Sequence, residues 1–217
     1  MTISDSTVAI IGTGNIGSRL AANFAAGGQD FLLAGRNQEA AGKIASGLNG
    51  HAEAVSIDEA IERADVLVIA LWMDAFEQLI AHYGDRLAGK VIVDPTNAIG
   101  PDGAGGYKKT IGEQESSGQI LAGLLPAGAR LVKAFGTLSA PSLSAAAWRE
   151  PERAVLFYAA DDAAAGDLVA DLIRASGFEP VRVGGLDQSI RIEMFGDLHE
   201  YGGLGRVVTR SEALKAI

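Results

Sequence analysis

One short stretch near the start of the chain, from Val8 to Gly17, constrains the fold more than any other. It reads Val-Ala-Ile-Ile-Gly-Thr-Gly-Asn-Ile-Gly, an apolar run followed by three glycines with the spacing G-x-G-x-x-G. The spacing alone is weak evidence, because the 28 glycines of the chain make accidental matches easy. Directly after a strand and at the start of a helix, however, it is typical of a dinucleotide-binding βαβ unit. The stretch therefore predicts that the fold begins with such a unit.

Each glycine of this turn has a separate expected role. Gly12 permits the tight turn, Gly14 lets the backbone approach a pyrophosphate that a side chain would block, and Gly17 lets the helix pack closely on the sheet. The free N–H groups and the dipole of the helix start would then bind the diphosphate. The alternative is a glycine turn that binds no ligand. The cofactor-binding residues expected here are Gly12, Thr13, Gly14, Asn15, Ile16 and Gly17.

The end of the second expected strand, Phe31-Leu-Leu-Ala-Gly-Arg-Asn, indicates which dinucleotide the unit prefers. In a unit that binds NAD(H), an Asp or Glu at this end takes the ribose hydroxyls, and this strand ends without one. Instead, Gly35 opens space, Arg36 offers a planar guanidinium suited to a 2′-phosphate, and Asn37 adds a hydrogen-bonding group. The alternative is that Arg36 is a solvated surface charge. The strand end therefore predicts a preference for NADP(H) over NAD(H).

Short apolar runs alternate with helical periodicity along the chain, which is typical of βα units on a parallel sheet. We expect an α/β fold, a doubly wound parallel Rossmann sheet of about eight strands, in a single domain over residues 1–217. Its core would cover 7–185, with a small helical extension over 186–217. The Gly-rich stretch 99–118 is expected to be a long loop, either a lid or a mobile segment, followed by a helix at 119–125. The strands are expected at 7–11, 31–34, 51–55, 66–70, 91–93, 131–135, 154–158 and 181–183.

The composition excludes several classes of partner and site. A net charge of −9 argues against nucleic acid and anionic membranes, which need clustered Lys and Arg. The absence of cysteine excludes disulfides and thiol catalysis, and no His, Asp and Glu set has metal-ligand spacing. The N-terminus lacks the pattern of a signal peptide, and no apolar stretch is long enough to span a membrane. A soluble cytoplasmic protein without a bound metal is expected.

With these features the chain resembles the F420-dependent NADP reductase family, which includes the NADPH-binding domain of the STEAP ferric reductases. The resemblance covers about residues 7–185 and rests on the glycine turn, on Gly35-Arg36, on Asp94-Pro-Thr-Asn97 after the fifth strand, and on Val132-Lys-Ala-Phe-Gly-Thr137. It implies that NADPH lies across the carboxyl ends of the strands. The residues that it implies near the nicotinamide are Ala70, Leu71, Trp72, Asn97, Ala134, Phe135 and Gly136.

Two of these positions depart from the family pattern. Family members commonly have Asn where Gly136 stands, and an apolar Asn-Pro turn where Asn97-Ala98 stands. Both lie where the hydride acceptor would dock, so the departures concern the acceptor more than the cofactor. Trp72 also faces the crevice by the switch-point rule for doubly wound sheets. Its ring would either line a pocket for a flat ring or cap the core.

The expected chemistry is hydride transfer between NADP(H) and a flavin-like acceptor, either coenzyme F420 or a free flavin. Stacked rings achieve such a transfer without a protein acid or base, so no catalytic residue is assigned. One alternative is reduction of a small carbonyl or imine, for which His199 is the candidate proton donor. Another is an NADP(H)-binding sensor without turnover. Since the chain is too short for an appended helical domain, we expect a partner subunit of a homodimer to complete the cleft.

Overall fold

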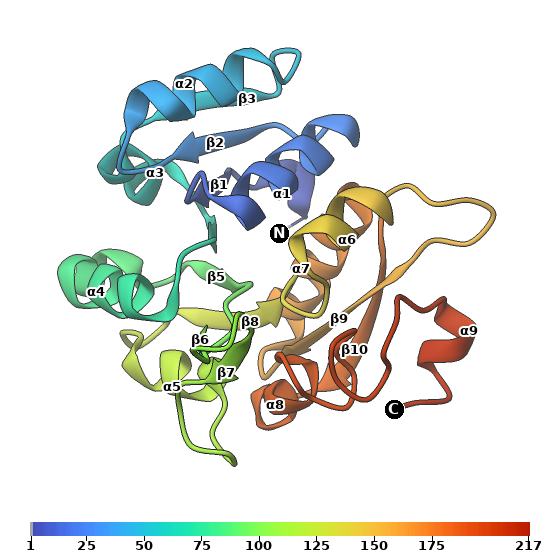
Figure 1. Ribbon diagram of the computed structural model, residues 1–217. Coiled ribbons are helices and arrows are strands. Elements are labelled where there is room, and N and C mark those ends of the chain that lie inside the picture. Colours follow the sequence, from blue (N-terminus) through green and yellow to red (C-terminus); the bar gives the residue numbers. More distant parts are fainter. Residues whose placement is uncertain (1) are drawn as a thin grey trace.

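Eight strands form one continuous sheet through the middle of the molecule (Figure 1). The computed structural model describes residues 2–217. The strand order is β10-β9-β8-β5-β4-β1-β2-β3, in which the chain winds outward in both directions from β1 and β4. This is the doubly wound arrangement that the sequence predicts. The strands are β1 (Val8–Ile11), β2 (Phe31–Ala34), β3 (Ala52–Val55), β4 (Val66–Ile69), β5 (Val91–Asp94), β8 (Arg130–Ala134), β9 (Val155–Ala160) and β10 (Glu179–Gly184).

Helices cover both faces of the sheet, because the inner strands are apolar on both sides. Along β1, Val8 and Ile10 point to one face, Ala9 and Ile11 point to the other, and all four side chains are buried. The first face is covered by α1 (Asn15–Ala26), α2 (Gln38–Ser46), α6 (Ala140–Ala145) and α7 (Ala163–Ala175). The second face is covered by α3 (Ile57–Arg63), α4 (Met73–Tyr83) and α5 (Ser117–Leu124).

One strand pair of the main sheet is not parallel. β9 runs antiparallel to β8, with Val132 opposite Ala160 and Ala134 opposite Tyr158, and β10 then runs parallel to β9. Between β8 and β9 the chain forms α6 at the carboxyl edge of the sheet and re-enters from that same edge, so it makes no crossover. The other pairs of the sheet are parallel, as predicted.

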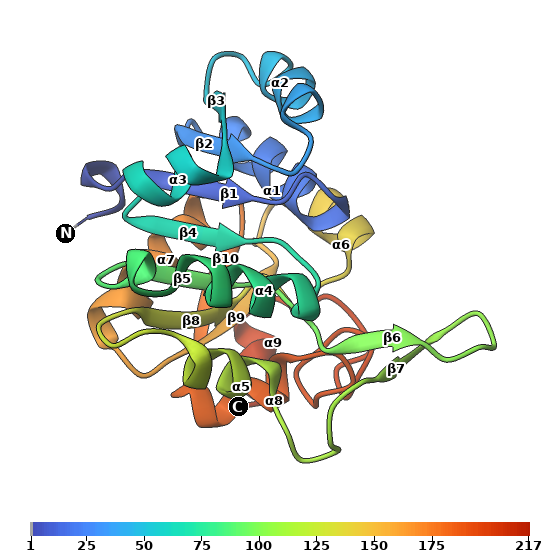
Figure 2. The ribbon, with the colours of Figure 1, turned by 90° about the vertical axis from the view of Figure 1, so that its left-hand side faces the viewer.

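The stretch predicted as a long loop contains a β-hairpin. β6 (Ile99–Pro101) and β7 (Tyr107–Lys109) pair antiparallel and stand out from the body of the molecule (Figure 2). The Asp102 carboxylate closes the turn between them, because it accepts hydrogen bonds from the N–H groups of Ala104 and Gly106. The prediction of a long loop in this part of the chain therefore missed two short strands.

The helix after this hairpin begins two residues earlier than predicted. α5 starts at Ser117, because the Ser116 hydroxyl accepts a hydrogen bond from the Gln119 N–H and so acts as its N-cap. The Glu193 carboxylate also accepts hydrogen bonds from the N–H groups of Ser117 and Gly118. The first turn of α5 is thus fixed by a residue far away in the sequence.

The C-terminal segment, residues 185–217, packs against the outer strands β9 and β10. It contains two α-helices of four residues each, α8 (Ser189–Ile192) and α9 (Arg210–Ala213), within a run of turns. The predicted helical extension is therefore helical only in part. Within residues 2–217, no helix has the length and apolar character needed to cross a membrane.

Candidate functional site

The residues expected to bind a ligand gather at one edge of the sheet. Ligands of doubly wound sheets bind outside the carboxyl ends of the strands, where the strand order reverses. Here that point lies between β1 and β4. The loops that leave β1, β2, β4, β5 and β8 meet at this edge, and the hairpin and part of the C-terminal segment stand beside them (Figure 2).

Two glycines of the turn are required by the packing of the protein itself. Gly12 has φ +120°, and a Cβ there would lie 2.3 Å from the Ala70 carbonyl oxygen. A Cβ on Gly17 would lie 1.9 Å from the carbonyl oxygen of Gly12. Both distances are far below van der Waals contact, so larger residues at these two positions would push β1, β4 and α1 apart.

Gly14 differs from its two neighbours in the motif. Its φ is −78°, which any residue adopts, and a Cβ there would meet no protein atom within 4 Å. Neither backbone conformation nor internal packing therefore requires glycine at this position. The space beside it lies open on the ligand side of the turn.

The start of α1 is left without a side-chain cap. Its N-cap is Gly14, and the first hydrogen bond of the helix runs from the Ser18 N–H to the Gly14 carbonyl at 3.0 Å. Within residues 2–217, the N–H groups of Asn15, Ile16 and Gly17 donate to no acceptor. By contrast, α2, α3, α5, α6 and α7 all begin with a capping side chain. The α1 N-terminus thus offers free donors and a positive dipole end to an anion.

Arg36 lies just after β2 with an exposed side chain. Among the residues that the structure describes, its guanidinium makes no hydrogen bond and no ion pair, whereas Arg63, Arg86 and Arg191 each pair with a carboxylate. Its five donors therefore remain available to an external anion such as a phosphate.

The neighbours of Arg36 have structural roles of their own. A Cβ on Gly35 would lie 3.1 Å from Thr13 Oγ1, so the Thr13 side chain occupies the space that the sequence analysis expected Gly35 to open for a ligand. The Asn37 side-chain oxygen accepts a hydrogen bond from the Ala40 N–H at 3.0 Å and caps α2. The side-chain amide nitrogen of Asn37 is left to donate to a ligand.

The loop after β4 forms the opposite wall of the crevice. Ala70 and Leu71 are partly buried beside Gly12, while the Trp72 side chain is 59% exposed. Trp72 is also the N-cap of α4, but its side chain makes no capping hydrogen bond. An indole in this position does not cap the core, which was one of the two roles expected for it.

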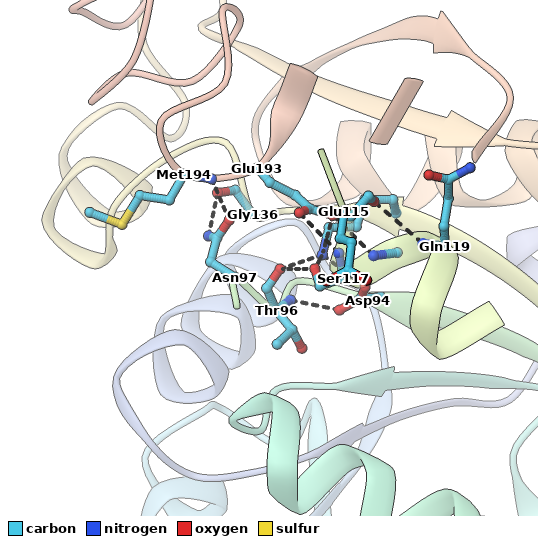
Figure 3. A network of polar contacts seen from close by, with 12 residues as sticks. Asp94, Thr96, Asn97, Glu115, Ser117, Gln119, Gly136, Glu193 and Met194 are labelled. Atoms are coloured by element: carbon cyan, nitrogen blue, oxygen red, sulfur yellow. Dashed lines mark hydrogen bonds and ion pairs between the residues drawn. The ribbon is translucent and has the colours of Figure 1, made fainter. Parts of the chain in front are cut away.

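Asn97 joins three segments at the carboxyl edge (Figure 3). Its amide nitrogen donates to the Gly136 carbonyl at 2.9 Å, and its amide oxygen accepts from the Met194 N–H at 2.6 Å. The side chain thereby ties the loops after β5 and β8 to the C-terminal segment. Met194 had no place among the residues expected from the sequence.

The loop after β8 presents backbone rather than side chains. Phe135 has a left-handed backbone (φ 64°), which is rare for a residue other than glycine. Its buried ring packs edge-on against Phe24 of α1, with 6.0 Å between the ring centroids. The Ala134 side chain is buried as well. Any contact of these two residues with a ligand would therefore be made by their main chain.

A buried polar network lies beneath this edge (Figure 3). The Lys133 ammonium lies 2.8 Å from an Asp94 carboxylate oxygen and 2.8 Å from Ser117 Oγ, to which it donates hydrogen bonds, and it also donates to the Thr96 carbonyl. A Glu193 oxygen lies 3.7 Å from the same ammonium. Lys133 is thus a paired residue inside β8. Glu193 had no place among the residues expected from the sequence.

Burial by itself raises the pKa of the Glu193 carboxyl. The Lys133 charge and the hydrogen bonds from Gly118, Ser116 and Ser117 outweigh that effect, so its pKa lies below the ordinary value. Glu193 is therefore ionised at neutral pH, and it links the C-terminal segment to α5 and to the centre of the sheet.

His199, the candidate proton donor, is enclosed by the C-terminal segment. It is 2% exposed, and its Nδ1 accepts a hydrogen bond from the Tyr201 N–H at 2.9 Å. Burial lowers the pKa of the imidazole, although Glu200 and the Gly136 carbonyl act against this. The ring is thus neutral and structural, and it does not lie on a surface that a neighbouring subunit would reach. Across residues 2–217, no group of three or more His, Asp or Glu side chains is arranged to hold a metal ion.

Known proteins resemble this chain in sequence and in fold. A family model described as NADP oxidoreductase, coenzyme F420-dependent, matches residues 7–98. A crystal structure of the protein SMa0349 from Sinorhizobium meliloti, described as hypothetical, is 30% identical with a TM-score of 0.81, covering 97% of this chain and 96% of that one. The F420-dependent NADP reductase of Methanothermobacter thermautotrophicus is 29% identical over 197 residues, covering 86% of this chain and 84% of the relative. These matches make the chain similar to the F420-dependent NADP oxidoreductases.

The family-model match and the curated relatives confirm the resemblance seen in the sequence. The metalloreductase STEAP3 of Rattus norvegicus is also 29% identical, over 186 residues that cover 86% of this chain. This chain spans only 35% of the length of that relative. NADP-dependent oxidoreduction is the chemistry of the F420-dependent NADP oxidoreductase family, and the open glycine turn and the free Arg36 lie in the part of the chain that its model matches.

Proposed function

We propose that the protein transfers a hydride between NADP(H) and a flavin-like acceptor such as coenzyme F420. The observation that carries the proposal is the environment of Gly14. It is the one glycine of the motif that the packing of the protein does not require, and it stands beside three N–H groups without a partner in the described chain. A diphosphate against the turn explains both features.

Different residues at the carboxyl edge would bind different parts of NADP(H). The N–H groups of Asn15, Ile16 and Gly17 would hold the diphosphate, and Arg36 would hold the 2′-phosphate. Ala70 and Leu71 would form the wall beside it. When bound, the nicotinamide supplies the hydride. The side chains that surround it would orient it and exclude water.

The environment of the titratable side chains beneath the carboxyl edge favours a hydride acceptor that needs no proton from the protein. Lys133 is buried and bonded to Asp94, and His199 is buried and bonded to the Tyr201 N–H. Neither side chain is free to protonate a carbonyl or imine oxygen or nitrogen. Transfer to a flavin-like ring depends instead on how the two rings are placed.

An assay of NADPH oxidation against a panel of acceptors tests the proposal. The panel contains F420, FMN, riboflavin, ferric chelates, and small carbonyls and imines. We expect oxidation with F420 or a flavin, and Gly14→Ala is expected to reduce it. Oxidation with carbonyls or imines alone would overturn the proposal. Tight NADPH binding with no oxidation by any acceptor would instead assign the protein as a sensor.

A further inference from the structure

An apolar groove of about 570 Å³ lies between the start of α4 and the β6–β7 hairpin. Its volume is within the range of about 300–1,000 Å³ that is typical of small-molecule sites. The first turn of α4 forms one wall and the hairpin forms the other. The residues that line it are Trp72, Met73, Asp74, Ile99, Gly100, Pro101, Tyr107 and Thr110.

Two large aromatic side chains stand exposed on this groove. Trp72 is 59% exposed on the α4 wall, and Tyr107 is 51% exposed on the hairpin wall. Ile99 and Pro101 add apolar surface between them. Neither ring fills the hydrophobic core, so their surface is available to a ligand with flat apolar faces.

The groove adjoins the proposed cofactor crevice. Trp72 follows β4 by three residues, and β4 borders the point where the strand order reverses. Ala70 of the same loop touches the glycine turn, since its carbonyl oxygen lies where a Cβ of Gly12 would stand. A ring held against Trp72 would therefore lie at the edge where the carboxyl ends of β1 and β4 meet.

A second cavity, on the side of the C-terminal segment, has a different character. Its volume is about 490 Å³, and its lining includes the charged side chains of Lys109, Glu113, Arg191, Glu193 and Asp197. Such a surface suits a polar group better than a flat apolar ring. One exposed aromatic residue, Phe195, lines this cavity and is 48% exposed.

We propose that the groove between α4 and the hairpin binds the tricyclic ring of the hydride acceptor, an isoalloxazine or deazaisoalloxazine. The outer ring of the tricycle would stack between Trp72 and Tyr107, and the reacting central ring would be left open to the nicotinamide. This assignment rests on the proposed function and specifies its second substrate site. In the reaction NADPH gives up a hydride to the ring and becomes NADP⁺. One proton from water completes the two-electron reduction of the acceptor. The tail of the acceptor would extend out of the groove into solvent.

Fluorescence of the protein reports on binding at this groove without turnover. The chain has two tryptophans, of which Trp72 lines the groove and Trp148 packs beside Gly27 and Gly177 at a different place in the fold. Riboflavin, FMN or F420 titrated into the NADP⁺-loaded protein is expected to quench Trp72 emission, after correction for absorbance. In Trp72→Phe, which keeps an aromatic ring, the remaining Trp148 emission is expected to be quenched much less than the wild-type emission.

Two matched variants decide which cavity takes the ring. Tyr107→Ala is expected to weaken acceptor binding and raise the acceptor KM by roughly tenfold, the scale expected for losing one aromatic stacking contact. Its NADPH affinity is expected to remain that of the wild type. Phe195→Ala removes an aromatic side chain of similar exposure from the other cavity, and both affinities are expected to remain unchanged.

The outcomes separate this assignment from the proposed function. Loss of acceptor affinity in Phe195→Ala but not in Tyr107→Ala would overturn the assignment while leaving the function intact. Absence of quenching by all three ring compounds, at concentrations that saturate turnover, would also overturn it. Quenching at Trp72 without NADPH oxidation would support the binding site and contradict the function.

Discussion

Gly14 and Gly17 stand three residues apart in one turn, yet an added methyl group would meet different surroundings at the two positions. At Gly17 it would strike the Gly12 carbonyl, and at Gly14 it would meet no protein atom. We expect Gly17→Ala to lower the free energy of unfolding by about 1–3 kcal/mol. Gly14→Ala is expected to change it by less than about 1 kcal/mol but to weaken NADPH binding about tenfold or more.

Thermal unfolding and calorimetric titration with NADPH measure these two effects separately. If Gly14→Ala bound NADPH as tightly as the wild type, the diphosphate would not lie against this turn. If Gly14→Ala instead unfolded as readily as Gly17→Ala, the turn would need glycine at position 14 for stability, and its role in binding would lose its main support.

Arg36 provides the second prediction at this scale, because its guanidinium has no partner within residues 2–217. Charge-assisted hydrogen bonds contribute about 1.5–3 kcal/mol, so Arg36→Ala is expected to weaken NADPH binding by roughly 10- to 100-fold. Binding of NADH, which lacks the 2′-phosphate, is expected to change by less than about twofold on the same reasoning. Equal losses for the two dinucleotides in parallel titrations would remove Arg36 from the phosphate site.

Single residues of the site could be predicted from the sequence where a motif fixes their spacing. The positions of the three glycines and of Arg36 follow from the strand that precedes each of them. The partner of Asn97 could not be predicted, because Met194 lies 97 residues further along the chain. Nor does a sequence reveal that Thr13 occupies the space beside Gly35, since that contact depends on how two loops pack.

At the scale of the elements, the packing of the C-terminal segment against α5 depends on one carboxylate, that of Glu193. The pKa of Glu193 is lowered in the folded protein. Its ionised form therefore stabilises the fold at any pH above 4.5, the ordinary pKa of Glu. This stabilisation is lost as the pH falls from 4.5 through the lowered pKa of the folded protein. Glu193→Gln is expected to lower the free energy of unfolding by about 3 kcal/mol at pH 7, because it leaves Lys133 less well compensated.

Denaturant unfolding of the wild type and of Glu193→Gln between pH 7 and pH 3 tests this dependence. The difference between the two proteins is expected to be constant near neutrality and to shrink as the pH falls below about 4.5, where Glu is half protonated in an unfolded chain. A difference of the same size at every pH would show that the Glu193 charge does not carry the effect.

The eight strands of the main sheet were predicted from the sequence, and the two strands of the hairpin were not. β1, β2 and β4 are continuous apolar runs, because helices cover both of their faces. β6 and β7 have three residues each, too few for an alternation to be recognised. The hairpin depends on the Asp102 turn instead, and it supplies half of the groove to which we assign the acceptor.

At the scale of the whole molecule, the fold brings two surfaces of different character to one edge of a sheet. The glycine turn and Arg36 offer positive dipole and charge to phosphate groups, while Trp72 and Tyr107 offer apolar faces beside them. A doubly wound sheet achieves this because successive loops leave its strands at the same carboxyl edge. The doubly wound arrangement was predicted from the alternation of the elements in the sequence, but the antiparallel entry of β9 was not.

An isotope label tests whether the protein transfers a hydride from NADPH directly to a flavin-like ring. The enzyme is mixed with F420 and, in separate reactions, with NADPH carrying deuterium on one or the other face of C4. F420 suits this measurement because its ring accepts the hydride on carbon, where the label does not exchange with water. We expect one of the two labelled forms to give reduced F420 with a single deuterium, seen by mass spectrometry. Reduced F420 without deuterium from either form, or no reduction of F420 or any flavin, would contradict it.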